Sequence, residues 1–292
     1  MNYIIENEAV RVTVADMGAE LMSLVLKSNN TEYLWQGDEK YWTGRATNLF
    51  PICGRLTDGK YTYQGNEYEM VLHGFAKKSV FSVIEQKKDS IVFSLRANEE
   101  TLKIYPFDFE LFITYTLCES TVRESYRVIN HGLERMYFAL GGHPGFNLPL
   151  EEGCSFEDYF VAFAQEKPAK ELVMEACYMT EETVPARLKD GKVIELTHSM
   201  FDKDAIFLQD MDTCVTLKAK KGQKSVTLRY PDMKYLGLWH KPKTAAPYVC
   251  IEPWQSLPGA EDDPQDWNQR AAAACLAPGE EWSTTLSTTF NR

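Results

Sequence analysis

Apolar and polar residues alternate along much of this chain of 292 residues. In the segment 109–117 every second residue is apolar, and this period of two is typical of a β-strand with one buried face. The same alternation marks Ser90–Arg96, 122–128, Cys214–Ala219, 225–230 and 282–288. A short connection that contains a glycine separates Cys214–Ala219 from 225–230, which predicts two neighbouring strands. We therefore predict many short strands joined by turns.

Helical periodicity is scarce. We predict one short helix at 263–276, because the four alanines at 271–274 favour it and Pro278-Gly279 would end it. No internal repeat or linker divides the chain, and a large all-β unit can reach this length. We predict a single domain over 1–292: a large antiparallel β-sandwich with few short helices. Such sheets bind ligands on a concave face or at loop ends, so functional residues should be dispersed in sequence.

Composition narrows the class of partner. Thirty-one basic and 42 acidic residues give a net charge of −11, and no block of Lys or Arg interrupts it. Nucleic acid and anionic membrane are therefore poor candidates, because both require a basic face. The seven cysteines are scattered without a C-x-x-C pair, and the first residues lack the pattern of an export signal. We expect a reduced, cytoplasmic protein that handles a small molecule, as a monomer or weak homodimer.

Several compact motifs are absent. The segment 54–61 nearly matches a phosphate-binding loop, but Tyr61 replaces the required hydroxyl residue and 61–63 resembles a strand rather than a helix. The sequence contains neither H-E-x-x-H nor G-x-S-x-G, and no two histidines are spaced i, i+4. Nothing argues for a metal. Acid–base chemistry by dispersed residues is what remains.

Two of the five histidines stand out. Gly74 follows His73 and allows close backbone approach, while three glycines and a proline surround His143 and indicate a rigid, unusual backbone. The others are predicted to be structural or solvated residues: His131 in a hairpin turn, His198 near a surface turn, and His240, for which a place at the rim of a site is the alternative.

Among the carboxylates, Glu252 is distinctive because it interrupts the apolar strand Tyr248–Trp254. Burial there should raise its pKa, which suits a general base near neutrality. Asp204 begins an apolar strand and is a weaker candidate, with a cap or turn as the alternative. Arg55 follows a glycine and is expected to be partly buried, where it could grip hydroxyls. Trp254 could stack on a sugar ring or simply fill the core.

Four motifs, in this order, resemble the aldose 1-epimerase (galactose mutarotase) superfamily, and more closely its LacX-like branch. They are FPICGRL at 50–56, HGF at 73–75, GHPGF at 142–146 and CIEPW at 250–254. The resemblance extends from 16–21 to the final strand. It implies a β-supersandwich with a sugar cleft on its concave side. The surroundings of both histidines differ from those in galactose mutarotases proper, so the sugar stays open.

The resemblance also implies roles. Glu252 corresponds to the catalytic base and His143 to the catalytic acid, while His73, Arg55 and Asp204 correspond to substrate-binding residues. The implied reaction interconverts the α and β anomers of a free aldose by ring opening and closure, without metal or cofactor. Mutual attraction is expected to keep one carboxylate and one imidazolium together.

Three alternatives stay open at this point. The first is a non-catalytic sugar-binding or sugar-sensing protein, which would need the cleft but not a matched acid and base. The second is glycoside hydrolysis by Asp204 with Glu252, which would leave both histidines unexplained. The third is a sugar phosphate as substrate; the acidic chain argues against it, although a few local basic residues would suffice.

Overall fold

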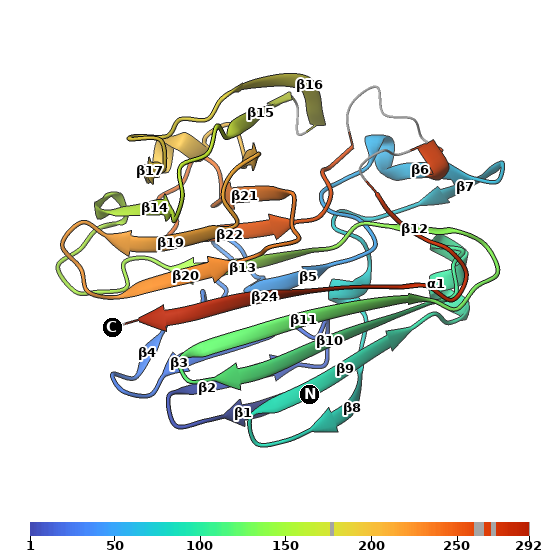
Figure 1. Ribbon diagram of the computed structural model, residues 1–292, viewed down its shortest axis with the longest axis horizontal. Helices are drawn as coiled ribbons and strands as arrows, with labels where there is room; N and C mark the ends of the chain where they lie inside the picture. Colours follow the sequence, from blue (N-terminus) through green and yellow to red (C-terminus); the bar gives the residue numbers. More distant parts are fainter. Residues whose placement is uncertain (176–177, 260–265, 270–272, 292) are drawn as a thin grey trace.

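The computed structural model describes residues 1–175, 178–259, 266–269 and 273–291, and Figure 1 shows a protein built almost entirely of β-strands. Every named strand pairs antiparallel with its neighbours. The predicted segment 109–117 is β10 (Phe109–Cys118), along which buried and more exposed residues alternate. The prediction of an all-β antiparallel sandwich with few short helices is thus confirmed.

The largest sheet has nine strands and runs across the view in Figure 1. In spatial order they are β17 (Val193–Glu195), β14 (Tyr159–Phe163), β19 (Cys214–Ala219), β20 (Ser225–Arg229), β24 (Glu281–Asn291), β11 (Thr121–Asn130), β10, β9 (Ser90–Arg96) and β8 (Ser82–Gln86). The predicted strand pair at 214–230 is therefore present as β19 and β20. All the alternating segments named above belong to this sheet.

A second sheet has seven strands and carries the residues of greatest chemical interest. In spatial order they are β16 (Tyr178–Pro185), β15 (Lys170–Glu175), β18 (Ile206–Gln209), β21 (Tyr235–Trp239), β22 (Tyr248–Trp254), β13 (Gly141–Asn147) and β5 (Ala46–Leu49). Its interior strand β22, between β21 and β13, is buried on both faces. Val249 and Ile251 enter the main hydrophobic core, whereas Cys250 and Trp254 belong to smaller clusters on the other face.

Smaller elements complete the fold. The remaining strands are β1 (Asn2–Glu6), β2 (Val10–Ala15), β3 (Leu21–Leu26) and β4 (Thr31–Glu32) in one sheet, β6 (Lys60–Tyr63) with β7 (Asn66–Glu69), and β12 (Met136–Phe138) with β23 (Ala274–Leu276). The described helical segments are α1 (Glu99–Ile104) and the 3-10 turns η1 (Thr57–Gly59), η2 (Ala76–Lys78), η3 (Phe156–Asp158), η4 (His198–Phe201) and η5 (Trp267–Gln269).

Apolar side chains from the three larger sheets share one core. Ile5 and Val12 from the four-stranded sheet, Leu111 and Ile113 from β10, and Ile251 from β22 belong to the same buried cluster. Burying such aliphatic side chains contributes roughly 1.5–3 kcal/mol each relative to leaving them exposed. The period-two alternation thus specifies which face of each strand turns inward. The opposite face of β22 lies outside the main core.

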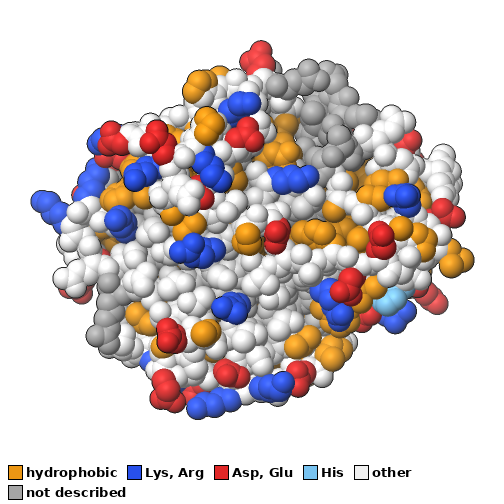
Figure 2. Space-filling model, viewed as in Figure 1, with side chains coloured by type: hydrophobic (Ala, Val, Ile, Leu, Met, Phe, Trp, Pro, Cys, Tyr) orange, Lys and Arg blue, Asp and Glu red, His pale blue; other side chains and the backbone are white. Residues whose placement is uncertain are grey.

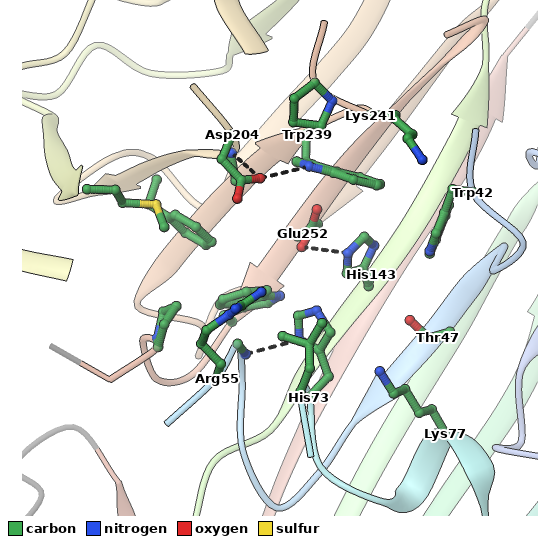
Figure 3. Close-up of a pocket in the computed structure, with 18 of the residues that line it drawn as sticks. Trp42, Thr47, Arg55, His73, Lys77, His143, Asp204, Trp239, Lys241 and Glu252 are labelled. Carbon is green, nitrogen blue, oxygen red and sulfur yellow. Dashed lines mark hydrogen bonds and ion pairs between the residues drawn. The ribbon is translucent and has the colours of Figure 1, made fainter. Parts of the chain in front are cut away.

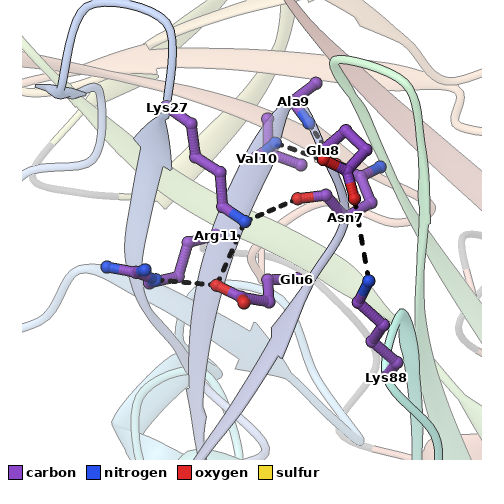
Figure 4. Close-up of polar contacts among 8 residues, drawn as sticks. All are labelled: Glu6, Asn7, Glu8, Ala9, Val10, Arg11, Lys27 and Lys88. Atoms are coloured by element: carbon purple, nitrogen blue, oxygen red, sulfur yellow. Dashed lines mark hydrogen bonds and ion pairs between the residues drawn. The ribbon is translucent and has the colours of Figure 1, made fainter.

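The turn between β1 and β2 ties the four-stranded sheet to the edge of the nine-stranded one (Figure 4). The side chain of Asn7 accepts hydrogen bonds from the backbone N–H groups of Ala9 and Val10, which closes the turn. Lys27, which directly follows β3, donates to the carbonyl of Asn7 at 2.6 Å. The backbone N–H of Glu6 donates to the carbonyl of Lys88, at the turn between β8 and β9, at 2.7 Å.

The helix predicted at 263–276 is wrong where the structure describes it. Residues 263–265 and 270–272 lie outside the described part, Trp267–Gln269 form a 3-10 turn, and Ala274–Leu276 form β23. Leu276 pairs with Met136 of β12 and is buried. Helix propensity is a weak preference that tertiary pairing overrides, and here strand pairing buries an apolar side chain.

Other expectations from composition can be compared with the described residues. Cys53, Cys118, Cys154, Cys214, Cys250 and Cys275 are all free thiols. No helix in the described part is both long and apolar enough to cross a membrane. On the face shown in Figure 2, acidic and basic side chains are interspersed.

Candidate active site

A cavity of about 430 Å³ opens on the face of the seven-stranded sheet that is turned away from the main core. All six residues singled out from the sequence line it: Arg55, His73, His143, Asp204, Glu252 and Trp254. They come from five separate segments of the chain, as expected for a site built on a sheet. Figure 3 shows how the labelled side chains surround the cavity.

Glu252 and His143 meet because strand register places them opposite each other. On β13 and β22, Gly141 pairs with Trp254 and Gly145 pairs with Cys250, so His143 faces Glu252 across the same ladder. The His143 Nε2 and Glu252 Oε2 atoms are 3.3 Å apart. One transverse row of the sheet therefore delivers the predicted acid and base to the same point.

This row continues on both sides of the pair. His143 pairs with Thr47 of β5, and Glu252 pairs with Gly237 of β21, which in turn pairs with Phe207 of β18. A Cβ at Gly237 would lie 3.0 Å from the ring of Phe207 and 3.3 Å from the Cβ of Glu252. The missing side chain at position 237 thus leaves room beside the carboxylate.

The glycines around His143 have a different role from the one predicted. His143 lies in a regular strand, not in an unusual backbone, and the described backbone has no positive φ at Gly141 or Gly145. A Cβ at Gly141 would lie 2.6 Å from the Trp254 ring, and one at Gly145 would lie 3.1 Å from the Trp42 ring. These glycines let aromatic rings pack closely against the strand that carries the imidazole.

Burial controls the charge of the pair. Glu252 and His143 have side-chain exposures of only 2% and 8%. Burial raises the pKa of Glu252 well above its ordinary value, with a smaller contribution from the charge of Asp204. Burial also lowers the pKa of His143. The raised pKa of Glu252 agrees with the prediction, but the expected mutual attraction does not prevail, because removing both groups from water favours their neutral forms.

Glu252 and His143 together hold one proton, which lies either on the carboxyl group or on the imidazole. Burial favours the form with the proton on Glu252 and a neutral His143. Moving that proton across the 3.3 Å contact produces a carboxylate beside an imidazolium, with no change in total charge. Titrations that follow this site will therefore report values that belong to the pair rather than to either residue.

The raised pKa of Glu252 predicts a pH-dependent stability difference. Above its ordinary pKa of 4.5, the unfolded chain releases a proton that the folded protein retains, so this group's contribution to stability falls as pH rises toward the folded pKa. We expect Glu252→Gln, which cannot titrate, to gain in free energy of unfolding relative to the unmodified protein between about pH 5 and about pH 8, by at most about 1.4 kcal/mol per pH unit. Denaturant unfolding at each pH measures this.

Glu110 offers the matched control. Burial acts to raise the pKa of Glu110, but hydrogen bonds from His131 and Ser94 lower it overall. Its contribution to stability is therefore present above its ordinary pKa and lost as pH falls, so Glu110→Gln is expected to show no gain with rising pH. A flat difference for Glu252→Gln would show that burial does not set the protonation of Glu252.

Some buried polar atoms at the cavity have no hydrogen-bond partner among the described residues. They are Nδ1 of His143, Oε1 of Glu252 and Nε1 of Trp254. Each buried polar atom without a partner costs about 1–3 kcal/mol, so such atoms are uncommon in folded proteins. Their concentration on side chains that line one cavity indicates a site adapted to a polar ligand.

His73 is held in one tautomer. Its Nδ1 accepts a hydrogen bond from the backbone N–H of Gly54 at 3.0 Å, so the proton of the neutral ring resides on Nε2. Burial, followed by the charge of His143, lowers the pKa of His73 well below its ordinary value. The prediction about Gly74 is confirmed: its φ is +69°, and a Cβ there would overlap the carbonyl oxygen of Phe50. His73 thus presents a hydrogen-bond donor at the cavity.

Asp204 and Arg55 lie at other parts of the cavity wall. Asp204 has a positive φ of 114°, and its Oδ1 accepts hydrogen bonds from the indole of Trp239 at 3.0 Å and the backbone N–H of Ala205 at 2.9 Å. Arg55 is exposed rather than partly buried, because its side chain reaches the open side of the cavity. Trp254 is 2% exposed and packs on Phe207, so it is mainly a packing residue of the cavity wall.

The remaining histidines lie away from the cavity lining. His131 is an exposed loop residue, as predicted, but the loop is not a hairpin turn, because it connects β11 to β12 and these two strands do not pair. His198 is half-buried, stacks on Phe156 and hydrogen-bonds to His240 at 3.1 Å. His240 is fully buried, which contradicts a place at the rim. Along the segment that holds it, Trp239 and Lys241 line the cavity instead, because alternate side chains of an extended backbone face opposite ways.

Sequence reasoning missed several lining residues. They are Tyr41, Trp42, Thr47, Lys77, Phe207, Trp239 and Lys241. The Trp42 ring lies 4.8 Å from the His143 ring, and the Trp239 ring lies 5.7 Å from it at a steep angle. Two tryptophans therefore enclose the imidazole. The alternation around His240 could have indicated Trp239 and Lys241. The other residues reach the cavity through strand register and the placement of loops, which the sequence pattern does not reveal.

A metal could also be held here. The donor atoms of His143, Cys250 and Glu252 all lie within 4.8 Å of one another, and all three residues are buried. Histidine, thiolate and carboxylate together are a donor set suited to zinc. The expectation that this site works without a metal therefore stays a prediction.

Comparison with known protein families agrees with this geometry. The family described as aldose 1-epimerase matches residues 1–289. The chain belongs to the aldose 1-epimerase family. The LacX proteins of Lactococcus lactis subsp. lactis, one plasmid and one chromosomal, are each 33% identical over 267 residues, covering 88% of this chain and 88% of theirs. The resemblance found in the sequence is confirmed.

Solved structures of similar proteins share the fold. A galactose mutarotase related enzyme from Lactobacillus acidophilus has a TM-score of 0.95 and 33% identity, covering 100% of this chain and 98% of its own. A galactose mutarotase-like protein from Lactobacillus casei ATCC 334 has a TM-score of 0.94 and 30% identity, covering 99% and 100%. The galactose mutarotase-like supersandwich predicted from the motifs is thus confirmed.

Proposed function

We propose that this member of the family is an aldose 1-epimerase that interconverts the α and β anomers of an aldose. The observation that carries the proposal is the contact between Glu252 and His143, 3.3 Å apart at the wall of a cavity of about 430 Å³. A cavity of this size suits a monosaccharide, since small-ligand sites usually measure about 300–1,000 Å³. The pair supplies one proton acceptor and one proton donor to neighbouring sugar oxygens.

Ring opening uses the charged form of the pair. The Glu252 carboxylate takes the proton of the anomeric hydroxyl while the His143 imidazolium gives a proton to the ring oxygen, and the bond between that oxygen and C1 breaks. The open-chain aldehyde rotates about C1–C2. In closure on the other face, neutral His143 takes the proton of the attacking hydroxyl and Glu252 returns its proton to the carbonyl oxygen. Protons therefore balance over the cycle.

Burial gives this cycle a preferred resting form. The form with a protonated Glu252 and neutral His143, which burial favours, is the form that ring closure requires. The cyclic sugar must meet the other form, which differs by one proton transfer within the pair. A bound sugar helps because its hydroxyls replace part of the lost hydration around the ionised groups.

Further residues are proposed to bind the sugar. The Nε2–H of His73 is placed to donate to a ring or hydroxyl oxygen, and the Asp204 carboxylate is placed to accept from a hydroxyl. Arg55 offers donors at the open side of the cavity. Trp42 and Trp239 can exclude water from the reacting atoms by packing against the apolar face of the ring.

The proposal predicts accelerated mutarotation. When the purified protein is added to freshly dissolved α-glucose, α-galactose and a panel of other aldoses, the decay of optical rotation should quicken for at least one sugar. The rate should be unchanged after dialysis against EDTA; loss that zinc restores would assign a metal to His143, Cys250 and Glu252. Calorimetric binding of a sugar without acceleration would favour a non-catalytic sugar-binding protein. Release of product from aryl glycosides would favour hydrolysis.

A further inference from the structure

Three side chains with metal-binding donor atoms meet beside the large cavity. The donor atoms of His143, Cys250 and Glu252 all lie within 4.8 Å of one another, and the three residues are buried. Cys250 and Glu252 are two residues apart on β22, so their side chains leave this strand on the same face. His143 reaches the same point from the neighbouring strand β13, where it faces Glu252. The sheet therefore holds an imidazole, a thiol and a carboxyl group together.

The spacing of these donors suits a zinc ion. The His143 Nε2 and Glu252 Oε2 atoms are 3.3 Å apart, which exceeds the usual N–H···O hydrogen-bond distance of about 2.7–3.2 Å. Nitrogen and oxygen ligands of tetrahedral zinc lie about 2.0–2.2 Å from the metal, and therefore about 3.3–3.5 Å from each other. A zinc-bound thiolate lies about 3.6 Å from such ligands, so a movement of the Cys250 Sγ by about 1 Å brings it to the metal. Two ligands are thus already in place and the third is near.

Burial makes a divalent cation a suitable partner for this cluster. The Oε1 of Glu252 is buried and has no hydrogen-bond partner among the described residues, so one carboxyl oxygen is uncompensated. A thiolate and a carboxylate carry two negative charges, and a neutral imidazole adds none. One Zn²⁺ ion balances these charges, so the three loaded side chains and the metal are neutral as a group, which avoids burying net charge. Histidine and thiolate donors favour zinc over magnesium and calcium.

A metal ion can reach the cluster from the cavity. His143 and Glu252 line the cavity, and Figure 3 shows them pointing toward each other, whereas Cys250 is fully buried and does not line it. An ion that enters through the cavity meets His143 and Glu252 first and reaches the Cys250 thiol beyond them. Its fourth coordination position then faces the cavity, where water can occupy it. Three protein ligands and one open position are a common zinc arrangement.

We infer that His143, Cys250 and Glu252 form a binding site for Zn²⁺, and that zinc bound there inhibits anomer exchange. The site itself rests on geometry; the inhibition rests on the proposed function, because zinc occupies the lone pairs that proton transfer requires. As zinc binds, the proton shared by Glu252 and His143 and the proton of the Cys250 thiol leave to solvent. Neither the acid nor the base is then free to act. Removal of the metal restores both groups.

Cobalt(II) is a suitable probe of the site, because it binds much as zinc does and its absorption spectrum reports its ligands. Protein treated with EDTA and then freed of the chelator is titrated with cobalt(II). One equivalent should produce tetrahedral d–d bands and a thiolate-to-cobalt charge-transfer band, and zinc should remove both. Cys250→Ser should lose the charge-transfer band. Its zinc affinity, measured against a chromophoric chelator, should fall by at least about 100-fold, since even partners outside the ligand shell contribute about 10–100-fold.

Cys214→Ser is the matched control. Cys214 is also a buried free cysteine, but it lies on β19 of the nine-stranded sheet and does not line the cavity. Free zinc at about ten times its dissociation constant should lower the mutarotation rate about tenfold, because only about one site in eleven stays empty. Excess EDTA should restore the rate. With each protein referred to its own rate in EDTA, Cys250→Ser should need at least about 100-fold more zinc for half inhibition, and Cys214→Ser the same amount as the unmodified protein.

The metal site and the inhibition can fail separately. Absence of the thiolate band from the unmodified protein, or its persistence in Cys250→Ser, would refute the site, and the first of these results needs no folded variant. A zinc-loaded protein that keeps or gains activity would refute the inhibition. If no aldose is exchanged faster at any zinc concentration, the proposed function fails and the inhibition with it, while the cobalt spectrum still decides whether the site exists.

Discussion

Glu252→Gln is expected to lower kcat for anomer exchange by about 100- to 10,000-fold, the usual contribution of a general base. Glutamine keeps the shape and the hydrogen-bonding oxygen of the side chain but cannot take a proton from the anomeric hydroxyl. The fold should persist, because Glu252 is buried in a preferred neutral form and its Oε1 has no partner among the described residues. Steady-state mutarotation and circular dichroism of the variant measure both effects.

The matched control is Glu124→Gln. Glu124 accepts a hydrogen bond from Tyr115, and burial raises its pKa to about 6, but it does not line the large cavity. This variant tests whether loss of any carboxylate with a raised pKa impairs the enzyme, and it should keep kcat within a few-fold. Mutarotation at the unmodified rate by Glu252→Gln, across several aldoses, would remove Glu252 from the chemistry.

Alternation of apolar and polar residues was a good guide to strands, because one face of each strand packs into a common core. The segment 109–117 corresponds to β10, and 282–288 lies within β24. Alternation does not reveal which strands are neighbours. β24, at the far end of the chain, pairs with β20 and β11 inside the nine-stranded sheet, and only the packed sheet specifies that arrangement.

The candidate site could be predicted where a residue conflicts with its local surroundings. Glu252 is a carboxylate in an apolar strand, and such a residue signals either a partner or a function. Lys77 and Trp42 offer no such signal, since a lysine in a turn and a tryptophan in a loop are ordinary. They become site residues only because β5 and its adjoining turn lie next to β13, and that placement depends on contacts far apart in sequence.

Charge at the site was the least predictable property. Mutual attraction between an acid and a base suggests an ion pair, but the outcome depends on how much water both groups lose. The sheet and the aromatic rings around His143 enclose the pair so completely that desolvation prevails. In the proposed reaction the same enclosure would strengthen the interactions made with the transition state, in which charge develops on two sugar oxygens.

His143→Asn should also lower kcat by about 100- to 10,000-fold, since asparagine can contact Glu252 but cannot give a proton to the ring oxygen. Because the two groups share one proton and act together, their effects should not add. The double variant with Glu252→Gln should be within about threefold of the slower single variant. Mutarotation rates of the three variants, measured at equal protein concentration, provide this comparison.

His131→Asn is the control for His143→Asn. His131 is an exposed histidine in the loop between β11 and β12, where it contacts Glu110 at 2.9 Å, and it does not line the cavity. Its replacement should leave the rate unchanged. If the losses in His143→Asn and Glu252→Gln multiply in the double variant, the two residues work independently, and transfer of a proton within the pair is not part of the mechanism. Rate losses that multiply in this way would require separate proton routes for the anomeric hydroxyl and the ring oxygen.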